Sequence, residues 1–307
     1  MKTHIVILNY NGEKLLPRCL PSIIEAAEKA QNPTQITILD NVSQDKSREA
    51  VKPFEDKVHW VDAPENKVLC SYNNFLSSID DDIVLLMNND IQVEPDFVDP
   101  LVNPFHKDSD LFMTVSKSLS SDGKRFEGGR TRFRLKYGIF WASSRFPGHE
   151  PLIDQQGFTM AAGYGAVDRK KFLALGGYDE LYLPGRLEDS DICFRAWRKG
   201  WKCLYEPQSV VYHSGAESFN EKFGEKGTLI INHRNSFLFL WKNLKDPWML
   251  VQHIFFLPFR LLFALIRGQM DFVQGFFKAL PLMGKALGRR EKNIKKVRTD
   301  KEIFEMV

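Results

Sequence analysis

The sequence predicts an α/β fold with a mostly parallel central sheet. Its 307 residues are 43% hydrophobic and 26% charged, enough apolar material for a buried core, which excludes wholesale disorder. Through the first hundred residues, short apolar runs alternate with segments whose apolar residues recur at helical spacing. Strands that alternate with helices in this way form βαβ units, whose parallel sheet is buried on both faces.

The elements of this first part follow one another in a regular order. β-branched or wholly apolar runs predict strands, and apolar residues at helical spacing predict helices. Because the strands are joined through helices, their carboxyl ends meet at one edge of the sheet. The predicted strands cover Thr3–Leu8, Gln35–Leu39, Val58–Val61 and Asp82–Met87, and the predicted helices cover Leu15–Ala30, Ser47–Phe54 and Val68–Ser78.

The second half of the chain is less regular. Residues 113–160 contain basic and glycine-rich stretches and are expected to form loops and short strands. Glycines then mark the ends of two helical patterns. The elements expected here are helices over Arg169–Leu175 and from about Glu188 to Gly200, and two late strands over Cys203–Tyr205 and Val210–Tyr212.

Composition also bounds the compartment. The four cysteines include no C-x-x-C pair and lie in apolar surroundings, so reduced thiols are expected rather than a disulfide framework or a zinc site. The amino-terminal apolar run is too short for a secretory signal and lacks a small-residue cleavage site. We therefore expect the protein to lie in the cytoplasm.

The net charge of +3 is the sum of two unequal parts. Residues 1–241 carry 29 Lys/Arg and 33 Asp/Glu, a net charge of −4. Residues 242–307 carry 13 Lys/Arg and 6 Asp/Glu, a net charge of +7. The body is thus mildly acidic, and the carboxyl-terminal part is strongly basic.

Polar side chains end three of the four early strands, where ligands of parallel sheets bind. Asp40 could accept hydrogen bonds from a base or a ribose, or it could form an Asx turn or helix cap. Asp90 could hold a divalent cation against phosphates, or it could form a turn. The residues at these strand ends are Asn9, Asn11, Asp40, Asn41, Asn88, Asn89 and Asp90.

Three carboxylates, Glu188, Asp189 and Asp191, crowd the start of one predicted helix. Acidic residues are common there because they cap helices and complement the helix dipole. Three within four residues exceed what a cap needs, and such close like charges raise at least one pKa toward the range of a general base. His213 follows a late strand, where it could be a structural residue or a ligand.

Seven stretches stand together in a recognisable order and spacing. They are Ile5–Gly12, Leu39–Asp45, Glu65–Lys67 with Asn73-Asn74, Leu85–Asp90, Gly176–Asp179, Glu188–Arg195, and Tyr212-His213. With these stretches the sequence resembles the family 2 glycosyltransferases of bacteria, in particular the rhamnosyltransferase-like branch that builds surface polysaccharides. The resemblance covers about residues 3–220.

This resemblance implies a GT-A fold, an αβα sandwich that binds a nucleotide, joined to an acceptor-binding half. It implies an inverting transfer of a sugar from a nucleotide-diphosphate sugar to a hydroxyl of a glycan or lipid-linked acceptor, in cell-surface polysaccharide synthesis. Asp189 would be the general base, supported by Glu188 and Asp191. Asp90 would bind Mg²⁺ or Mn²⁺, with His213 as a further contact. The residues that would bind the nucleotide sugar are Asn9, Asn11, Asp40, Asn66, Asn73 and Asn89.

One position departs from the family pattern. The metal motif of the family is often Asp-x-Asp, and here Asn88 stands at its first position. Asp90 is then the one clear carboxylate of the motif, so the cation would be bound more weakly or would rely on phosphate oxygens.

The carboxyl-terminal part is predicted to form amphipathic helices on a membrane. Trp248–Ile266 has the length of a spanning helix, but an Arg near its middle and Pro258 disfavour spanning. A second apolar stretch, Phe272–Leu287, precedes six Lys/Arg between residues 289 and 298. This pattern suits the anionic inner surface of the cell membrane, and a helical hairpin packed on the body or a dimer interface is the alternative. Nucleic acid is not expected, because no recognition motif accompanies the basic cluster.

Together these parts define the expected organisation. A glycosyltransferase domain over residues 1–225 divides into a nucleotide-sugar half, about 1–112, and an acceptor half, about 113–225. Residues 226–307 form a basic, helical, membrane-associating region, so the protein would be cytoplasmic and peripheral on the inner face of the cell membrane.

Two other functions stay open. A nucleotidyltransferase would be expected to carry a glycine-rich, basic phosphate loop after its first strand, which Asn9–Gly12 lacks. A non-catalytic sugar-nucleotide-binding protein is disfavoured by the presence of Asp40, Asp90 and Asp189.

Overall fold

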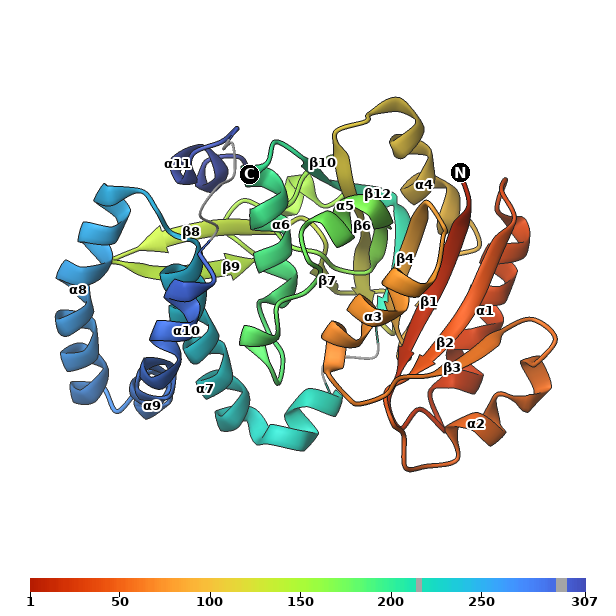
Figure 1. Ribbon diagram of the computed structural model, residues 1–307, viewed down its shortest axis with the longest axis horizontal. Helices are drawn as coiled ribbons and strands as arrows, with labels where there is room; N and C mark the ends of the chain where they lie inside the picture. Colours follow the sequence, from red (N-terminus) through yellow and green to blue (C-terminus); the bar gives the residue numbers. More distant parts are fainter. Residues whose placement is uncertain (214–216, 291–296) are drawn as a thin grey trace.

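The computed structural model describes residues 1–213, 217–290 and 297–307, and it is a three-layer α/β structure with a helical carboxyl-terminal part (Figure 1). The strands are β1 Thr3–Asn9, β2 Thr34–Asp40, β3 His59–Asp62, β4 Ile83–Asn88, β5 Ile91–Val93, β6 Leu111–Ser120, β7 Phe126–Gly128, β8 Arg132–Lys136, β9 Ile139–Ser143, β10 Gly157–Phe158, β11 Gly165–Asp168 and β12 Lys202–His213. The α-helices are α1 Leu16–Lys29, α2 Ser47–Ala50, α3 Ser71–Ser78, α4 Val98–Lys107, α5 Arg169–Ala174, α6 Glu188–Arg198, α7 Glu217–Asn243, α8 Pro247–Ile266, α9 Met270–Ala279, α10 Met283–Gly288 and α11 Asp300–Phe304.

The main sheet has the strand order β10-β12-β6-β11-β4-β1-β2-β3. β4, β1, β2 and β3 pair in parallel, and so do β12 and β6. β11 joins these two groups by antiparallel pairing on both of its sides, so β6 and β12 run in the same direction as β1 and β4. The predicted α/β class and mostly parallel sheet are confirmed, and His213 ends at the same edge as Asn9, Asp40 and Asn88.

The alternation of apolar side chains along the early strands gives the sheet two covered faces. Ile5 and Ile7 of β1 point to one face, where they join the core formed with α1 and α4. Val6 and Leu8 point to the other face, which is covered by α3, α5 and α6. Strands that are apolar on both faces need helices on both sides, and this requirement produces the αβα sandwich.

Two expectations for the later strands were wrong in detail. Residues 111–120 form one long inner strand, β6, where loops and short strands were expected from residue 113 on. The hydroxyls of the buried Thr114 and Ser116 find partners in Leu101 O and Ser209. Buried polar residues of this kind interrupt the apolar pattern by which a strand is predicted from the sequence. The two late strands are one strand, β12, whose register with β6 shifts between Glu206 and Val210.

The carboxyl-terminal helices share a hydrophobic core with the rest of the chain. Phe239 of α7 stacks on Phe140 of β9 with ring centroids 4.0 Å apart, and Phe133, Phe194 and Phe304 surround the pair. The predicted boundary at residue 225 falls beside Gly224, where α7 is kinked. The part of α7 after this kink packs on α9, with α8 beyond (Figure 1).

Candidate active site

The first group of predicted site residues meets at the carboxyl ends of β1, β2 and β4. The parallel register pairs Asn9 with Asp40, and the fully buried Asn9 donates a hydrogen bond to Asp40 Oδ1 over 2.8 Å. Asn89 Nδ2 donates to Asn9 Oδ1 over 2.7 Å, and Ser43 donates to Asp40 through both its amide and its hydroxyl. Asn9, Asp40 and Asn89 therefore brace one another, and they fix the shape of the loops that follow the strands.

Asn11 and Gly12 complete this edge. Asn11 has a left-handed backbone, with φ of 52°, and its side-chain oxygen accepts a hydrogen bond from the amide of Gln44. A Cβ on Gly12 would lie 2.1 Å from Asn9 Oδ1, so only glycine lets the loop pass this close to Asn9. Asn11 thus ties the loop after β1 to the loop after β2.

The metal-ligand candidates Asp90 and His213 come together because β5 pairs with β12 and places Ile91 opposite His213. His213 Nε2 lies 3.3 Å from Asp90 Oδ2, and its Nδ1 lies 2.9 Å from Glu127 Oε2. Burial alone would lower the pKa of His213, but the two carboxylates raise it above its ordinary value. Asp90 Oδ1 is buried and, within the described residues, has no hydrogen-bond partner.

An unpartnered buried carboxylate oxygen is a costly feature unless a ligand completes it. Within the described part of the chain, no three or more His, Cys, Asp or Glu side chains are grouped as a metal site. Mg²⁺ is often held by one or two carboxylates and by substrate phosphates rather than by a full set of protein ligands. The donor set of Asp90 and His213 fits a divalent cation of that kind.

The other two nucleotide-site candidates, Asn66 in a loop and Asn73 in α3, bond to the backbone. Asn66 is exposed, and its Oδ1 accepts a hydrogen bond from the amide of Val68. Asn73 both donates to the carbonyl and accepts from the amide of Tyr178, over 2.8 and 2.9 Å. The amide group of Asn73 thereby fixes the loop at Gly177–Tyr178, and its contact with a nucleotide stays a prediction.

The acidic start of α6 lies at the same edge of the sheet. α6 ends shortly before β12 begins, and β12 begins at the opposite edge of the sheet. Glu188 and Asp189, at the start of α6, therefore lie near the edge where β12 ends at His213 (Figure 1). Burial raises the pKa of Asp189. Burial, and next the charge of Asp189, raise the pKa of Glu188 to about 8. Glu188 Oε2 is buried and, within the described residues, lacks a hydrogen-bond partner.

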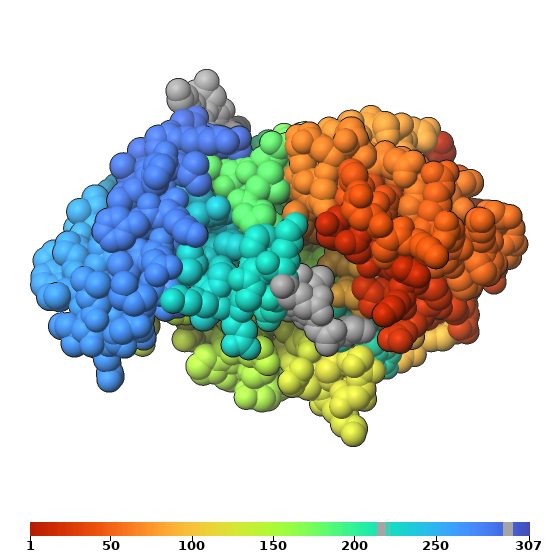
Figure 2. Space-filling model, turned by 90° about the horizontal axis from the view of Figure 1, so that it is seen from below, coloured from red at the N-terminus to blue at the C-terminus, as the bar shows by residue number. Residues whose placement is uncertain are grey.

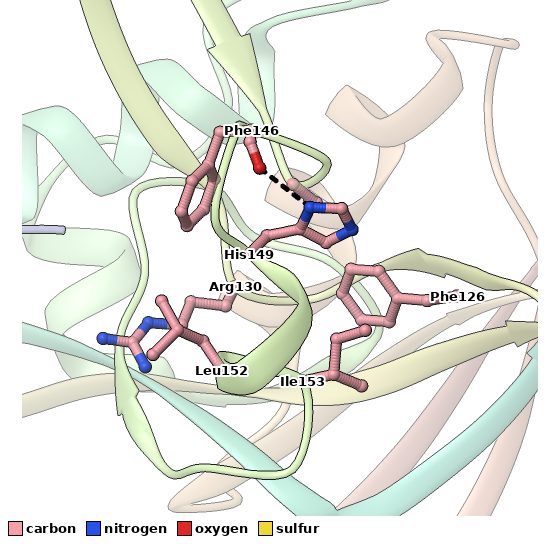
Figure 3. Close-up of a pocket in the computed structure, with 7 residues that line it drawn as sticks. Phe126, Arg130, Phe146, His149, Leu152 and Ile153 are labelled. Carbon is pink, nitrogen blue, oxygen red and sulfur yellow. Dashed lines mark hydrogen bonds between the residues drawn. The ribbon is translucent and has the colours of Figure 1, made fainter.

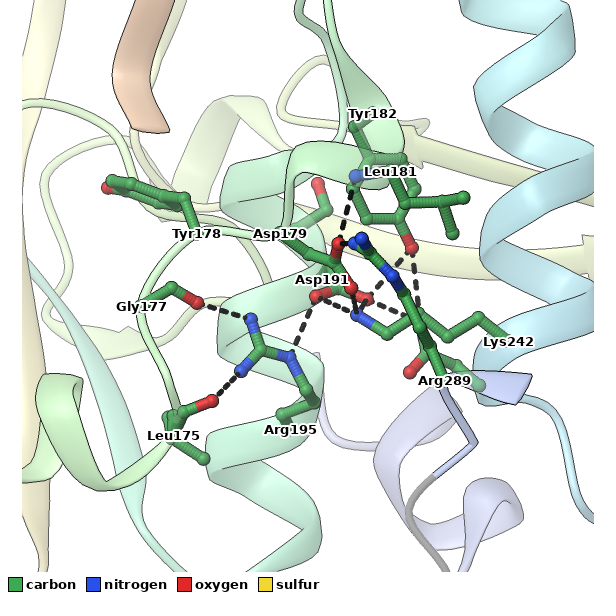
Figure 4. A network of polar contacts seen from close by, with 12 residues as sticks. Leu175, Gly177, Tyr178, Asp179, Leu181, Tyr182, Asp191, Arg195, Lys242 and Arg289 are labelled. Atoms are coloured by element: carbon green, nitrogen blue, oxygen red, sulfur yellow. Dashed lines mark hydrogen bonds and ion pairs between the residues drawn. The ribbon is translucent and has the colours of Figure 1, made fainter. Parts of the chain in front are cut away.

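Asp191 belongs to a separate, buried polar network (Figure 4). It accepts hydrogen bonds from Lys242 on both oxygens, from Arg195 over 2.7 Å, from Asn243 over 2.7 Å and from Tyr182 over 2.8 Å. Burial would raise the pKa of Asp191, but the charges of Lys242 and Arg195 hold it below its ordinary value. Its predicted support of Asp189 is therefore indirect, because Asp191 fastens α6 to the end of α7.

The loop before α6 carries backbone strain that α7 holds in place. Arg186 and Leu187 both have left-handed backbones, with φ of 78° and 71°, immediately before Glu188. The buried Asn235 of α7 donates its side-chain amide to the carbonyls of Tyr182, Gly185 and Arg186, over 3.0, 2.7 and 2.7 Å. Arg234, its neighbour, donates to the carbonyls of Tyr182 and Leu183. Two successive left-handed non-glycine residues persist only where their surroundings fix them, and Asn235 supplies that fixation.

Two hollows lie outside the strand-end group. Phe126, Arg130, Phe146, His149, Leu152 and Ile153 line the first, which leaves no room for a ligand and holds β7 by packing (Figure 3). The second, of about 400 Å³, lies between the loop at residues 175–180 and the side chains of Arg195, Lys242 and Arg289. Each of these three cations pairs with Asp179 or Asp191, so none of them lacks a carboxylate partner.

Sequence reasoning missed two residues of this site. Glu127 reaches His213 only because β7 pairs with β6 and β6 pairs with β12. Asn235 lies in α7, which was assigned to the membrane-associating region. Neither position carries a local motif, so no signal in the sequence could have placed them.

This αβα sandwich, with polar strand ends and an acidic helix start at one edge, has the GT-A fold of glycosyltransferases. The solved structures agree: Staphylococcus aureus TarS 1-349 in complex with UDP-GlcNAc superposes with a TM-score of 0.59 at 14% identity, covering 94% of this chain and 84% of that one. The mannosyltransferase PcManGT from Pyrobaculum calidifontis, in complex with GDP-Man and Mn²⁺, gives 0.55 at 14% identity, covering 93% and 75%. At these identities the likeness shows the fold alone.

The family model described as Glycosyl transferase family 2 matches residues 4–175, more than half of the chain. The protein therefore belongs to glycosyl transferase family 2. Drosophila melanogaster N-acetylgalactosaminyltransferase 7 is 25% identical over 263 residues, which cover 76% of this chain and 44% of the relative. This chain thus spans less than half the length of that relative, and the bacterial rhamnosyltransferase-like branch stays a prediction.

Proposed function

We propose that the protein is an inverting glycosyltransferase that moves a sugar from a nucleotide-diphosphate sugar to a hydroxyl group of an acceptor. The observation that carries the proposal is Asp90 Oδ1, a buried carboxylate oxygen without a partner within the described residues, at the strand-end edge. Membership of glycosyl transferase family 2 supports the same reaction class. Relatives solved with UDP-GlcNAc or GDP-Man support a nucleotide-sugar donor.

The donor would lie across the carboxyl ends of β1, β2 and β4. The loops braced by Asn9, Asp40 and Asn89 give the nucleotide a preformed surface, which lowers the entropy lost on binding. Mg²⁺ or Mn²⁺ would be held by Asp90, with His213 beside it, and when bound would offset negative charge on the leaving nucleoside diphosphate. Glu127 orients His213 by its hydrogen bond to Nδ1.

Asp189 would be the general base. Its carboxylate takes the proton of the acceptor hydroxyl while the hydroxyl oxygen forms the new bond to the anomeric carbon and the bond to the diphosphate oxygen breaks, its electron pair leaving with the diphosphate. A single displacement of this kind inverts the anomeric centre. Burial raises the pKa of Asp189, which makes its carboxylate a better proton acceptor.

The acceptor we propose is a glycan or lipid-linked glycan of cell-surface polysaccharide synthesis, as the rhamnosyltransferase-like resemblance implies. The basic carboxyl-terminal part, with its net charge of +7, suits a cytoplasmic protein that is peripheral on the inner face of the cell membrane. There it would meet an acceptor whose lipid lies in the membrane.

The test is a screen of nucleotide-diphosphate sugars for thermal stabilisation with Mg²⁺ or Mn²⁺, followed by turnover of the stabilising donor and analysis of the product by NMR. We expect stabilisation by at least one such donor and a product with the opposite anomeric configuration. Retention of configuration, or release of pyrophosphate from a nucleoside triphosphate, would overturn the proposal in favour of another transferase class.

A further inference from the structure

Helix α8 has two faces of opposite character. Its 20 residues include apolar side chains that project into solvent, among them Trp248 at 68%, Ile254 at 70% and Ile266 at 74% exposure. At 100° per residue, the exposed positions occupy about half of the circumference of the helix. The exposed apolar side chains of this outer face are Trp248, Val251, Ile254, Phe255, Phe259, Leu262, Phe263, Leu265 and Ile266.

The inner face of α8 is fastened to the protein. His253 is only 3% exposed, and its ring lies 2.6 Å from Gly138 O at the tip of the β8–β9 hairpin and 3.1 Å from Trp241 Nε1. A Cβ on Gly138 would lie 2.6 Å from His253 Cα, so helix and hairpin meet backbone to backbone. Leu257 and Leu261 pack on the main core, and the Arg260 guanidinium lies over the ring of Phe272.

The charges beside this outer face are almost all positive. Between residues 247 and 290 the chain has six Lys/Arg and one acidic residue, Asp271, which pairs with His233. Arg267, at the carboxyl end of α8, is exposed and lies over the ring of Phe263. Lys278 and Lys285 are exposed on α9 and α10. Three exposed cations thus lie at the end of α8 and on the two helices that follow it, and they complement an anionic surface.

We propose that the outer face of α8 enters the headgroup layer of an anionic lipid leaflet and that α8 lies flat in that layer without crossing the membrane. A patch of nine exposed apolar side chains on one helix face marks an interaction site. Aromatic and aliphatic side chains on one face, with cations at the border, fit the interface of a lipid leaflet. The position of α8 at the end of the molecule away from the amino-terminal half leaves this face open (Figures 1 and 2).

Length and composition alone would allow a different arrangement. Among the helices of the described residues, α8 is the one that is long and apolar enough to cross a membrane. Crossing would surround the helix with lipid, which requires His253 to leave Gly138 and Trp241 and exposes Arg260 to the acyl chains. A flat helix keeps all three contacts and gives lipid only the face that is already exposed.

The first test is flotation of the full chain with vesicles of phosphatidylglycerol and phosphatidylcholine. We expect binding to the mixed vesicles and little binding to pure phosphatidylcholine. Phe255→Glu with Phe259→Glu should weaken binding by at least about 100-fold, since two exposed aromatic side chains that the proposal inserts into the leaflet are lost. Val61→Glu, an exposed apolar position on β3, is the matched control and should bind as the wild type does. Equal binding of the double variant, or a dimer in solution that this variant dissociates, would overturn the proposal.

The second test separates a flat helix from a spanning one. The four native cysteines are buried, so single cysteines at positions 251, 259 and 266 can be labelled with nitroxides. A flat helix places all three labels at similar shallow depths, whereas a spanning helix places the middle label deepest. The second pattern would overturn the flat arrangement.

The proposal rests on the proposed function only in supplying a lipid-linked acceptor, and the two can fail separately. If flotation failed but the wild type and the double variant hydrolysed a soluble nucleotide sugar alike, the proposed transferase function would still be supported. Flotation without any turnover would support the membrane-binding face of α8 and contradict the proposed transferase function.

Discussion

The two sides of the candidate active site are held in place by different kinds of contact. On the donor side, Asn9, Asp40, Ser43 and Asn89 all lie within the first ninety residues and bond to one another at the ends of neighbouring strands. On the acceptor side, the start of α6 is held by α7, about fifty residues further along the chain. The proposed donor side is a property of the parallel sheet, and the position of the proposed base, Asp189, depends on the carboxyl-terminal helices.

The largest expected effect breaks the link between α6 and α7. Asp191→Ala should lower the free energy of unfolding by about 3–5 kcal/mol, because the buried charges of Lys242 and Arg195 lose their shared partner. Urea denaturation measures the loss. Asp62→Ala, which removes an exposed carboxylate on the donor side, is the control with little expected change. Similar losses in both variants would show that the two sides are held alike.

Asn235 offers a way to move the proposed base, Asp189, without substituting it. Asn235→Ala should lower kcat by about 100-fold while KM for the donor stays the same, because the strained loop before Glu188 relaxes and shifts Asp189. Steady-state kinetics give the split between kcat and KM. Ser236→Ala, which loses only a hydrogen bond within α7, is the matched control. A rise in donor KM without a fall in kcat would assign Asn235 to the donor side instead.

Asp90 tests the donor side. Asp90→Asn should weaken metal-dependent donor binding by at least about 10-fold, since even indirect partners of a metal ligand contribute that much to affinity. Calorimetry with and without Mn²⁺ measures it. Asp62→Asn makes the same change of charge on the last residue of β3, at the same sheet edge, and should leave the affinity unchanged. Equal affinities for Asp90→Asn and wild type in Mn²⁺ would remove Asp90 from the metal site.

The smallest effect concerns pH and Glu188. Because burial raises the pKa of Glu188 to about 8, the folded protein keeps a proton that the unfolded chain releases near pH 4.5. The free energy of unfolding therefore falls as the pH rises from about 4.5 to 8 and stays lower above it. Glu188→Gln removes this dependence, so its Tm relative to wild type should be a few degrees higher at pH 9 than at pH 5. The same Tm difference at both pH values would contradict the raised pKa.

The donor side was largely predictable from the sequence, and the acceptor side was not. Apolar runs in the sequence predict the strands that end at Asn9, Asp40 and Asn88, and parallel pairing then brings the ends of these strands together. The strain at Arg186 and Leu187, by contrast, depends on a helix that begins thirty residues later. The meeting of Glu127 with His213 depends on the register of three strands.

Individual side chains show the same limit within correct elements. Asn73 lies in the helix that its spacing predicts, yet its amide group is taken up by the backbone of Tyr178. Asp191 stands one turn into the predicted acidic helix and faces Lys242. A sequence pattern places a residue on an element, but the partner of its side chain is decided by packing between elements distant in the sequence.

The most direct test of the proposed division of the site compares the wild type with Asp189→Asn, using the same nucleotide-sugar donor for both. We expect calorimetry to give nearly equal donor affinities in Mn²⁺ while the turnover number falls by about 10²–10⁴, the contribution of a general base. Near-normal turnover by Asp189→Asn would contradict the assignment of Asp189 and, with it, the proposed division of the site into a donor side and a base held by α7.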